Sequence, residues 1–199
     1  MNLRIIFVSL LLAISMTYTG YTQDEPPVLS GIRGSYLILN GGMDSMKLKG
    51  LESSNHQFIF CMFHAEEDPI GLDPGLSTDG RWRAINLLKI LKNLEFKAFF
   101  TTPFRNNILT LQPLTEFKGM ELTYYDQADL ISLYNQVEYQ NPGNLLMMIH
   151  HSTFPKIFKH FTGKDLMEDV SLEPANRIYI IHRSPKSNPE FFIFRYNIR

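Results

Sequence analysis

Histidines follow two apolar stretches of the chain, and hydroxyl groups and an arginine follow a third. His64 comes directly after the apolar run 58–63, whereas His150 and His151 follow the run 145–149. Thr101 ends a further apolar run, and Arg105 lies four residues beyond it. Imidazole nitrogens can attack a reacting group or transfer protons, and hydroxyl and guanidinium groups can hold an anion. These residue types predict a pocket for a phosphate-like group.

The apolar runs have the length and continuity of strands that are buried on both faces. Helical patterns separate them, and an alternation of strands and helices is typical of a mostly parallel sheet covered by helices. We therefore predict a three-layer α/β/α sandwich. Its expected strands are 58–63, 96–101 and 145–149, and its expected helices are 78–94, 105–118, 127–139 and 152–161. Ligands bind beyond the carboxyl ends of such strands, where the polar residues lie.

Both ends of this pattern carry additional features. Strand-like segments at 177–182 and 191–196 flank a turn-rich stretch, which predicts a C-terminal antiparallel hairpin. Residues 35–39 form one more strand-like run. We expect a linker at 23–34 and a single folded domain at 35–199.

The first residues have the pattern of an export signal. Arg4 precedes an apolar segment at 5–14, and small or polar residues follow up to a predicted cleavage near Thr22. An apolar segment of about 10 residues is too short to span a bilayer and fits a secretory signal peptide, which we assign to 1–22. The alternative is an uncleaved membrane anchor. We expect an exported protein, periplasmic or extracellular, without a membrane partner after cleavage.

Composition restricts the partners of the mature chain. The 199 residues include 19 Lys+Arg and 20 Asp+Glu, so the chain has no basic excess for nucleic acid. A single cysteine excludes an internal disulfide and a cysteine-rich zinc site. We expect no metal ion and no cofactor, and the sequence carries no signal for an oligomeric state.

Five segments together resemble the motifs of the histidine phosphatase superfamily (phosphoglycerate mutase-like), in its small SixA-type branch. Residues 61–66 (Cys-Met-Phe-His-Ala-Glu) resemble its Arg-His-Gly or Arg-His-Ala-Glu motif. The segments 73–81, 100–103, 110–114 and 148–152 resemble motifs that follow in the same order. The resemblance covers most of the mature chain and implies an α/β/α sandwich, in agreement with the periodicity.

The resemblance also implies roles for individual residues. His64 matches the nucleophile that becomes a phosphohistidine, and His151 matches the second pocket histidine, which contacts the phosphoryl group. The acid that protonates the leaving group varies in position within the family. Glu66 and Asp126 are candidates for this acid, although neither lies in a matching motif.

Two departures from the family pattern concern the residues that bind the phosphoryl group. Phe63 and Asn106 stand where the family has its two pocket arginines, and His150 replaces a glycine. Charge-assisted hydrogen bonds from arginine contribute about 1.5–3 kcal/mol each, so losing both costs roughly 10²–10⁴ in rate. Arg105 could compensate from the adjacent position. We expect the remaining phosphate contacts to come from Arg105, Asn106, Thr101 and His150.

Two hypotheses follow for function. We favour an exported, degenerate member of the family with weak or no phosphomonoesterase activity, which binds an anion or a protein. The alternative is an active phosphomonoesterase or phosphohistidine phosphatase that uses His64 as nucleophile, with Arg105 in place of the lost arginines. The expected ligand of either protein is phosphate, or a phosphorylated small molecule or protein.

Overall fold

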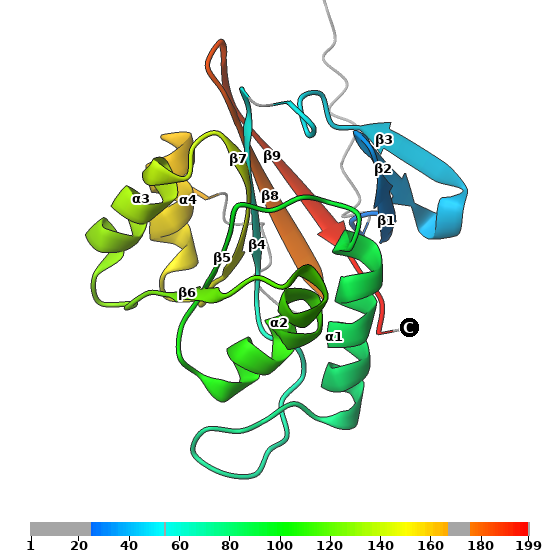
Figure 1. Ribbon diagram of the computed structural model, residues 1–199, viewed down its shortest axis with the longest axis vertical. Helices are drawn as coiled ribbons and strands as arrows, with labels where there is room; N and C mark the ends of the chain where they lie inside the picture. Colours follow the sequence, from blue (N-terminus) through cyan, green and yellow to red (C-terminus); the bar gives the residue numbers. More distant parts are fainter. Residues whose placement is uncertain (1–24, 54, 167–175, 199) are drawn as a thin grey trace, which may run out of the picture.

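A six-stranded sheet forms the centre of the molecule (Figure 1). The structure is a computed structural model that describes residues 25–53, 55–166 and 176–198, so the predicted signal peptide lies outside the described residues. Four parallel strands follow one another across the sheet, namely β6 (Leu122–Tyr124), β5 (Ala98–Thr101), β7 (Gly143–Met148) and β4 (Gln57–Met62). The antiparallel strands β8 (Arg177–Ser184) and β9 (Ser187–Arg195) complete it. The predicted parallel sheet and C-terminal hairpin are confirmed.

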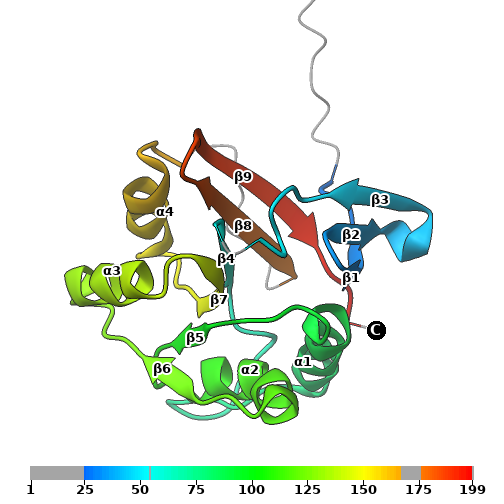
Figure 2. The ribbon, with the colours of Figure 1, turned by 45° about the horizontal axis from the view of Figure 1, so that its top comes forward.

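Helices cover both faces of this sheet, as Figure 2 shows from a second direction. One core contains side chains of α1 (Thr78–Leu91) and α2 (Arg105–Lys118). The core on the opposite face contains side chains of α3 (Leu130–Tyr139) and α4 (Phe154–Thr162). The predicted three-layer sandwich is therefore confirmed.

Strand β4 is apolar from Phe58 to Met62 because both of its faces are covered. All six of its residues are buried. Phe58, Phe60 and Met62 belong to the core of α1 and α2, whereas Ile59 and Cys61 belong to the core of α3 and α4. Because alternate side chains of a strand point to opposite faces, a strand covered on both sides is apolar on both. The exception is Gln57 at its start, whose side chain is hydrogen-bonded to the Val137 carbonyl and to Arg183.

One strand of the central sheet was missed by the prediction, and several element boundaries differ from it by a few residues. Strand β6 was not predicted, because its three residues are partly or fully exposed and carry no apolar run. Helix α3 begins at Leu130 rather than at 127, since the Asp129 side chain accepts a hydrogen bond from the backbone N–H of Ser132 and caps the helix there.

A small antiparallel sheet precedes the central one. It consists of β1 (Leu29–Arg33), β2 (Tyr36–Leu39) and β3 (Asp44–Lys47), with a 3-10 turn, η1 (Asn40–Gly42), between the last two. Strand β1 occupies residues Leu29–Arg33 of the linker predicted at 23–34, so this part of the segment is a strand. Leu29 and Ile32 are buried with the first core, and this burial holds the segment in place. No helix within the described residues is long and apolar enough to cross a membrane.

Candidate active site at the carboxyl ends of β4, β5 and β7

Strand register brings the predicted histidines to one edge of the sheet. Met62 of β4 pairs with Met148 of β7, so His64 and His150 each lie two residues beyond an aligned pair. On the other side of β7, Phe100 of β5 pairs with Met147. The carboxyl ends of these three strands therefore meet, at the lower end of the sheet in Figure 1.

His64 is held in one tautomer. Its Nδ1 lies 2.8 Å from the carbonyl oxygen of Ala65, and a carbonyl only accepts, so Nδ1 carries the proton. The neutral ring then has an unprotonated Nε2, which is the form a nucleophile requires. Thr110 of α2 fixes this turn, because its hydroxyl accepts a hydrogen bond from the Ala65 N–H and donates one to the Asn106 carbonyl.

His150 lies in a neutral hydrogen-bonding cluster. Its Nε2 is 2.9 Å from the Thr102 hydroxyl, and the Asn107 side-chain amide donates to the same hydroxyl at 2.6 Å. The hydroxyl therefore donates its own proton to Nε2. Burial, together with the smaller effect of the positive charges that His64 and His151 can carry, lowers the pKa of His150 from 6.5 to about 4. At pH 7 His150 is neutral, so it does not supply a charge for an anion.

The lowered pKa of His150 predicts a loss of stability in acid. Above pH 6.5 the ring is neutral in both the folded and the unfolded chain, whereas between pH 6.5 and about 4 only the unfolded chain takes up a proton. We expect His150 to cost about 2 kcal/mol of unfolding free energy across this window, less than the full shift implies because the ring is only partly buried and solvent screens its charge. Urea unfolding of His150→Gln measured at pH 7 and pH 4 checks this. The variant should lose less stability than the wild type, and an equal loss would contradict the assignment.

His151 is exposed and stacks on Phe63. The two rings are 4.2 Å apart with an interplanar angle of 9°. Phe63 itself is buried against Phe154 and Tyr179. An apolar ring therefore occupies the position beside the second pocket histidine where the family resemblance implies an arginine.

Asn106 makes contacts within the protein rather than presenting donors to a ligand. Its side-chain amide nitrogen donates to a carboxylate oxygen of Glu67 at 2.9 Å, and its amide oxygen accepts from the backbone N–H of Asn107. Asn106 is only 8% exposed, whereas Glu67 is exposed. The position that the resemblance assigns to a cation is thus paired with an acid.

Two other predicted phosphate contacts point elsewhere. Arg105 is exposed, and its guanidinium carbon lies 3.6 Å from the place that a Cβ on Gly75 would occupy, in a groove between α1 and α2. Thr101 is buried, and its hydroxyl donates to the carbonyl oxygen of Thr102. Thr102, one residue further along the strand, faces His150 instead. Because successive side chains of a strand point to opposite faces, Thr102 contacts His150 and Thr101 does not.

Both candidates for the proton donor are engaged in local contacts. Glu66 forms a salt bridge with Arg83 of α1, and the hydrogen bond from Arg83 lowers the pKa of this carboxyl. An acid with a lowered pKa is a weak proton donor near neutral pH. Asp126 is exposed and caps its own turn, where its carboxylate accepts from the Ala128 N–H. The geometry therefore argues against both, and it brings forward Glu67, three residues after His64.

Arg177 is a cation that the sequence analysis missed. It begins β8, which pairs with β4 so that Ile178 faces Met62, and this places Arg177 next to Phe63. Its side chain hydrogen-bonds with Tyr179, whose ring lies 6.0 Å from that of Phe63. Only the antiparallel register of β8 against β4 reveals this proximity, because the two residues are far apart in sequence.

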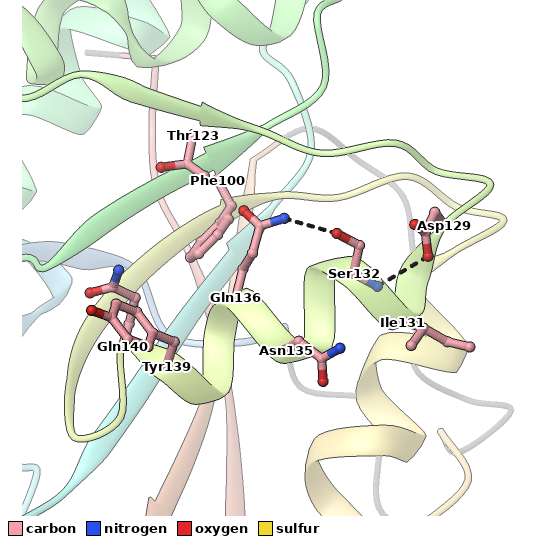
Figure 3. A pocket seen from close by; sticks show the side chains of 9 residues that line it. All are labelled: Phe100, Thr123, Asp129, Ile131, Ser132, Asn135, Gln136, Tyr139 and Gln140. Atoms are coloured by element: carbon pink, nitrogen blue, oxygen red, sulfur yellow. Dashed lines mark hydrogen bonds between the residues drawn. The ribbon is translucent and has the colours of Figure 1, made fainter.

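The described residues around the histidine cluster (His64, His150 and His151) form no metal site, and one wide hollow of the surface lies apart from them. Among the described residues, no group of three or more His, Cys, Asp or Glu side chains is arranged to hold a metal ion. A hollow of about 610 Å³ lies along α3, where Figure 3 shows amide and hydroxyl side chains such as Gln136 and Ser132. It contains no histidine and none of the predicted site residues.

Comparison with known proteins identifies the fold. No protein-family model and no curated protein sequence matches the chain. Solved structures do match. The protein histidine phosphatase SixA in complex with tungstate superimposes with a TM-score of 0.52 at 16% identity, over 70% of this chain and 97% of SixA.

Two further structures agree. Bacillus stearothermophilus YhfR matches with a TM-score of 0.54 at 14% identity, over 67% of this chain and 94% of its own. A mycobacterial glucosyl-3-phosphoglycerate phosphatase with inorganic phosphate matches with a TM-score of 0.54 at 10% identity, over 72% and 98%. At these identities the shared property is the fold. The chain therefore has the histidine phosphatase (phosphoglycerate mutase-like) fold, and the fold that the motif resemblance implied is confirmed.

Proposed function

We propose that this chain is an exported member of the histidine phosphatase superfamily whose phosphomonoesterase activity is weak or lost. It retains a site for a phosphate-type ligand, offered by a small molecule or a protein, with low affinity. The fold and the strand-end position of His64 support membership of the superfamily. The apolar segment at 5–14 supports export.

The contact between Asn106 and Glu67 is the observation that carries this proposal. A phosphoryl dianion needs positive donors around it, and a carboxylate at that place raises its free energy. Phe63 offers no donor, and His150 is neutral at pH 7 because of its lowered pKa. The site thus keeps histidines that could react. On its β5 and β7 side it lacks the cations that would stabilise the transferring phosphoryl group.

Hydrolysis assays test the proposal. An aryl phosphate and a phosphohistidine peptide should be turned over at rates close to background by the wild type. His64→Ala should give similar rates, whereas His160→Ala serves as a control that removes a histidine from the exposed side of α4. Turnover well above background that His64→Ala abolishes and His160→Ala leaves intact would contradict the proposal.

An active phosphatase is the second candidate, favoured by the tautomer of His64. In that reaction Nε2 of His64 attacks phosphorus, the bond to the leaving oxygen breaks, and Glu67 protonates that oxygen. Water then cleaves the phosphohistidine. Arg177, beside Phe63, would supply the positive charge in place of Arg105.

This second candidate has its own signature. Glu67→Gln should lower kcat for aryl phosphate by at least about 10²-fold, the usual contribution of general acid catalysis. Glu121→Gln, which neutralises an exposed acid before β6, should not. Equal kcat values in the wild type and Glu67→Gln would exclude Glu67 as the acid.

A further inference from the structure

A groove of about 350 Å³ lies between α1 and α2, outside the histidine cluster. Its walls combine apolar side chains with two guanidinium groups. The lining residues on which the argument rests are Leu76, Ala84, Ile85, Leu109, Arg81 and Arg105. This volume lies at the lower end of the range of small-molecule sites.

The two arginines are held at the groove by contacts that leave their outer nitrogens available. Arg81 donates its Nε–H to the Leu76 carbonyl oxygen at 3.2 Å. The Arg105 guanidinium lies over Gly75. Within the described residues, no carboxylate lies within 4.0 Å of either guanidinium. Asp73 is nearby, but it accepts from the backbone N–H of Arg105.

We propose that this groove binds a small amphipathic carboxylate, a molecule with one anionic head and a short aliphatic chain. The two guanidiniums supply the charge complement for the head, because arginine recognises carboxylates through paired N–H donors. Leu76, Ala84, Ile85 and Leu109 supply the apolar contact for the chain. A small anion without a chain would contact only the two guanidiniums, and a neutral alcohol would contact only the apolar side chains. A ligand that uses both sets of contacts is therefore an anion with an aliphatic chain.

The single tryptophan of the chain provides a direct readout. Trp82 is 42% exposed and lies on α1 next to Arg81. Titration of the full-length protein with octanoate should change its fluorescence saturably, with a Kd below about 1 mM. Acetate and octanol should each bind at least tenfold more weakly. Isothermal titration calorimetry checks the same constants independently of Trp82.

Variants distinguish binding in this groove from nonspecific binding of octanoate to the protein surface. Arg105→Gln and Arg81→Gln should each weaken octanoate binding by roughly tenfold or more, the loss expected for one charge-assisted contact. Lys89→Gln, which removes a cation from the last turn of the same helix, should leave the Kd unchanged.

Three outcomes would overturn the proposal. These are the absence of saturable octanoate binding, equal affinity for octanol, and affinity that survives both arginine changes. Binding of an acidic peptide without binding of octanoate would also contradict the proposal, because it would show that the groove binds a protein partner. Because His64 takes no part in the groove, His64→Ala should retain octanoate binding whatever the outcome of the phosphatase assays.

Discussion

Replacing Asn106 with arginine and Glu67 with glutamine is expected to strengthen binding of inorganic phosphate by about 10²-fold. The double change removes a carboxylate that Asn106 contacts at 2.9 Å and puts a guanidinium at the start of α2. One charge-assisted hydrogen bond is worth about 1.5–3 kcal/mol, and removal of the repelling charge adds to it. Isothermal titration with phosphate at pH 7.5 measures the change.

The single variants separate the two contributions. Glu67→Gln alone should improve phosphate binding modestly, since it removes repulsion without adding a donor. Asn106→Arg alone should improve it less than the double variant, because Glu67 can pair with the new guanidinium. A double variant that binds phosphate no better than the wild type would mean that position 106 does not face the ligand.

Replacing Arg83 with methionine is expected to lower the free energy of unfolding by about 3 kcal/mol. Arg83 is buried and forms a salt bridge with Glu66, and it also donates to the Tyr196 carbonyl oxygen at 3.0 Å. It thereby joins α1 to the turn after His64 and to the end of β9. Methionine removes the hydrogen bonds to both partners and leaves the Glu66 carboxylate without its cation. Urea unfolding monitored by circular dichroism measures the loss.

A double-mutant cycle isolates the ion pair from the packing of Arg83. Glu66→Gln should also destabilise, because it leaves the charge of Arg83, whose side chain is only 6% exposed, without its carboxylate partner. Adding Glu66→Gln to Arg83→Met should then cost little, since no buried charge remains to be paired. Strictly additive losses would contradict a coupling between the two residues.

Gly80 allows the start of α1 to pack closely against the turn after His64. A Cβ at position 80 would lie 2.0 Å from the backbone oxygen of Glu66. Only glycine lets the first turn of α1 approach the turn after His64 this closely. The helix start and the residues that follow His64 therefore form one rigid unit, which Arg83 stabilises from the next turn.

The layers of the fold could be predicted from sequence because they depend on patterns that lie along the chain. Strand β4 is apolar from Phe58 to Met62 because both of its faces are covered, and α1 begins at residue 78 as predicted. Strand β1 was missed because Val28, Leu29 and Ile32 form neither a continuous apolar run nor a strict alternation. Their burial depends on contacts with distant segments, which a local pattern does not contain.

The histidine cluster was predictable for the same reason, whereas its electrostatics were not. His64, His150 and His151 follow apolar runs, and strand register alone brings them together. The direction of Arg105 depends on the packing of α1 against α2, and the choice of Thr102 over Thr101 depends on the phase of β5. Arg177 reaches the edge of the cluster only through the register of β8 against β4.

Phosphate affinity of the unmodified protein tests the central claim most directly. At pH 7.5, isothermal titration of the wild type with inorganic phosphate should give a Kd weaker than about 1 mM, because neither Asn106 nor the neutral His150 supplies a positive charge. A micromolar Kd that His64→Ala and His151→Ala both abolish would contradict a weakened phosphate site.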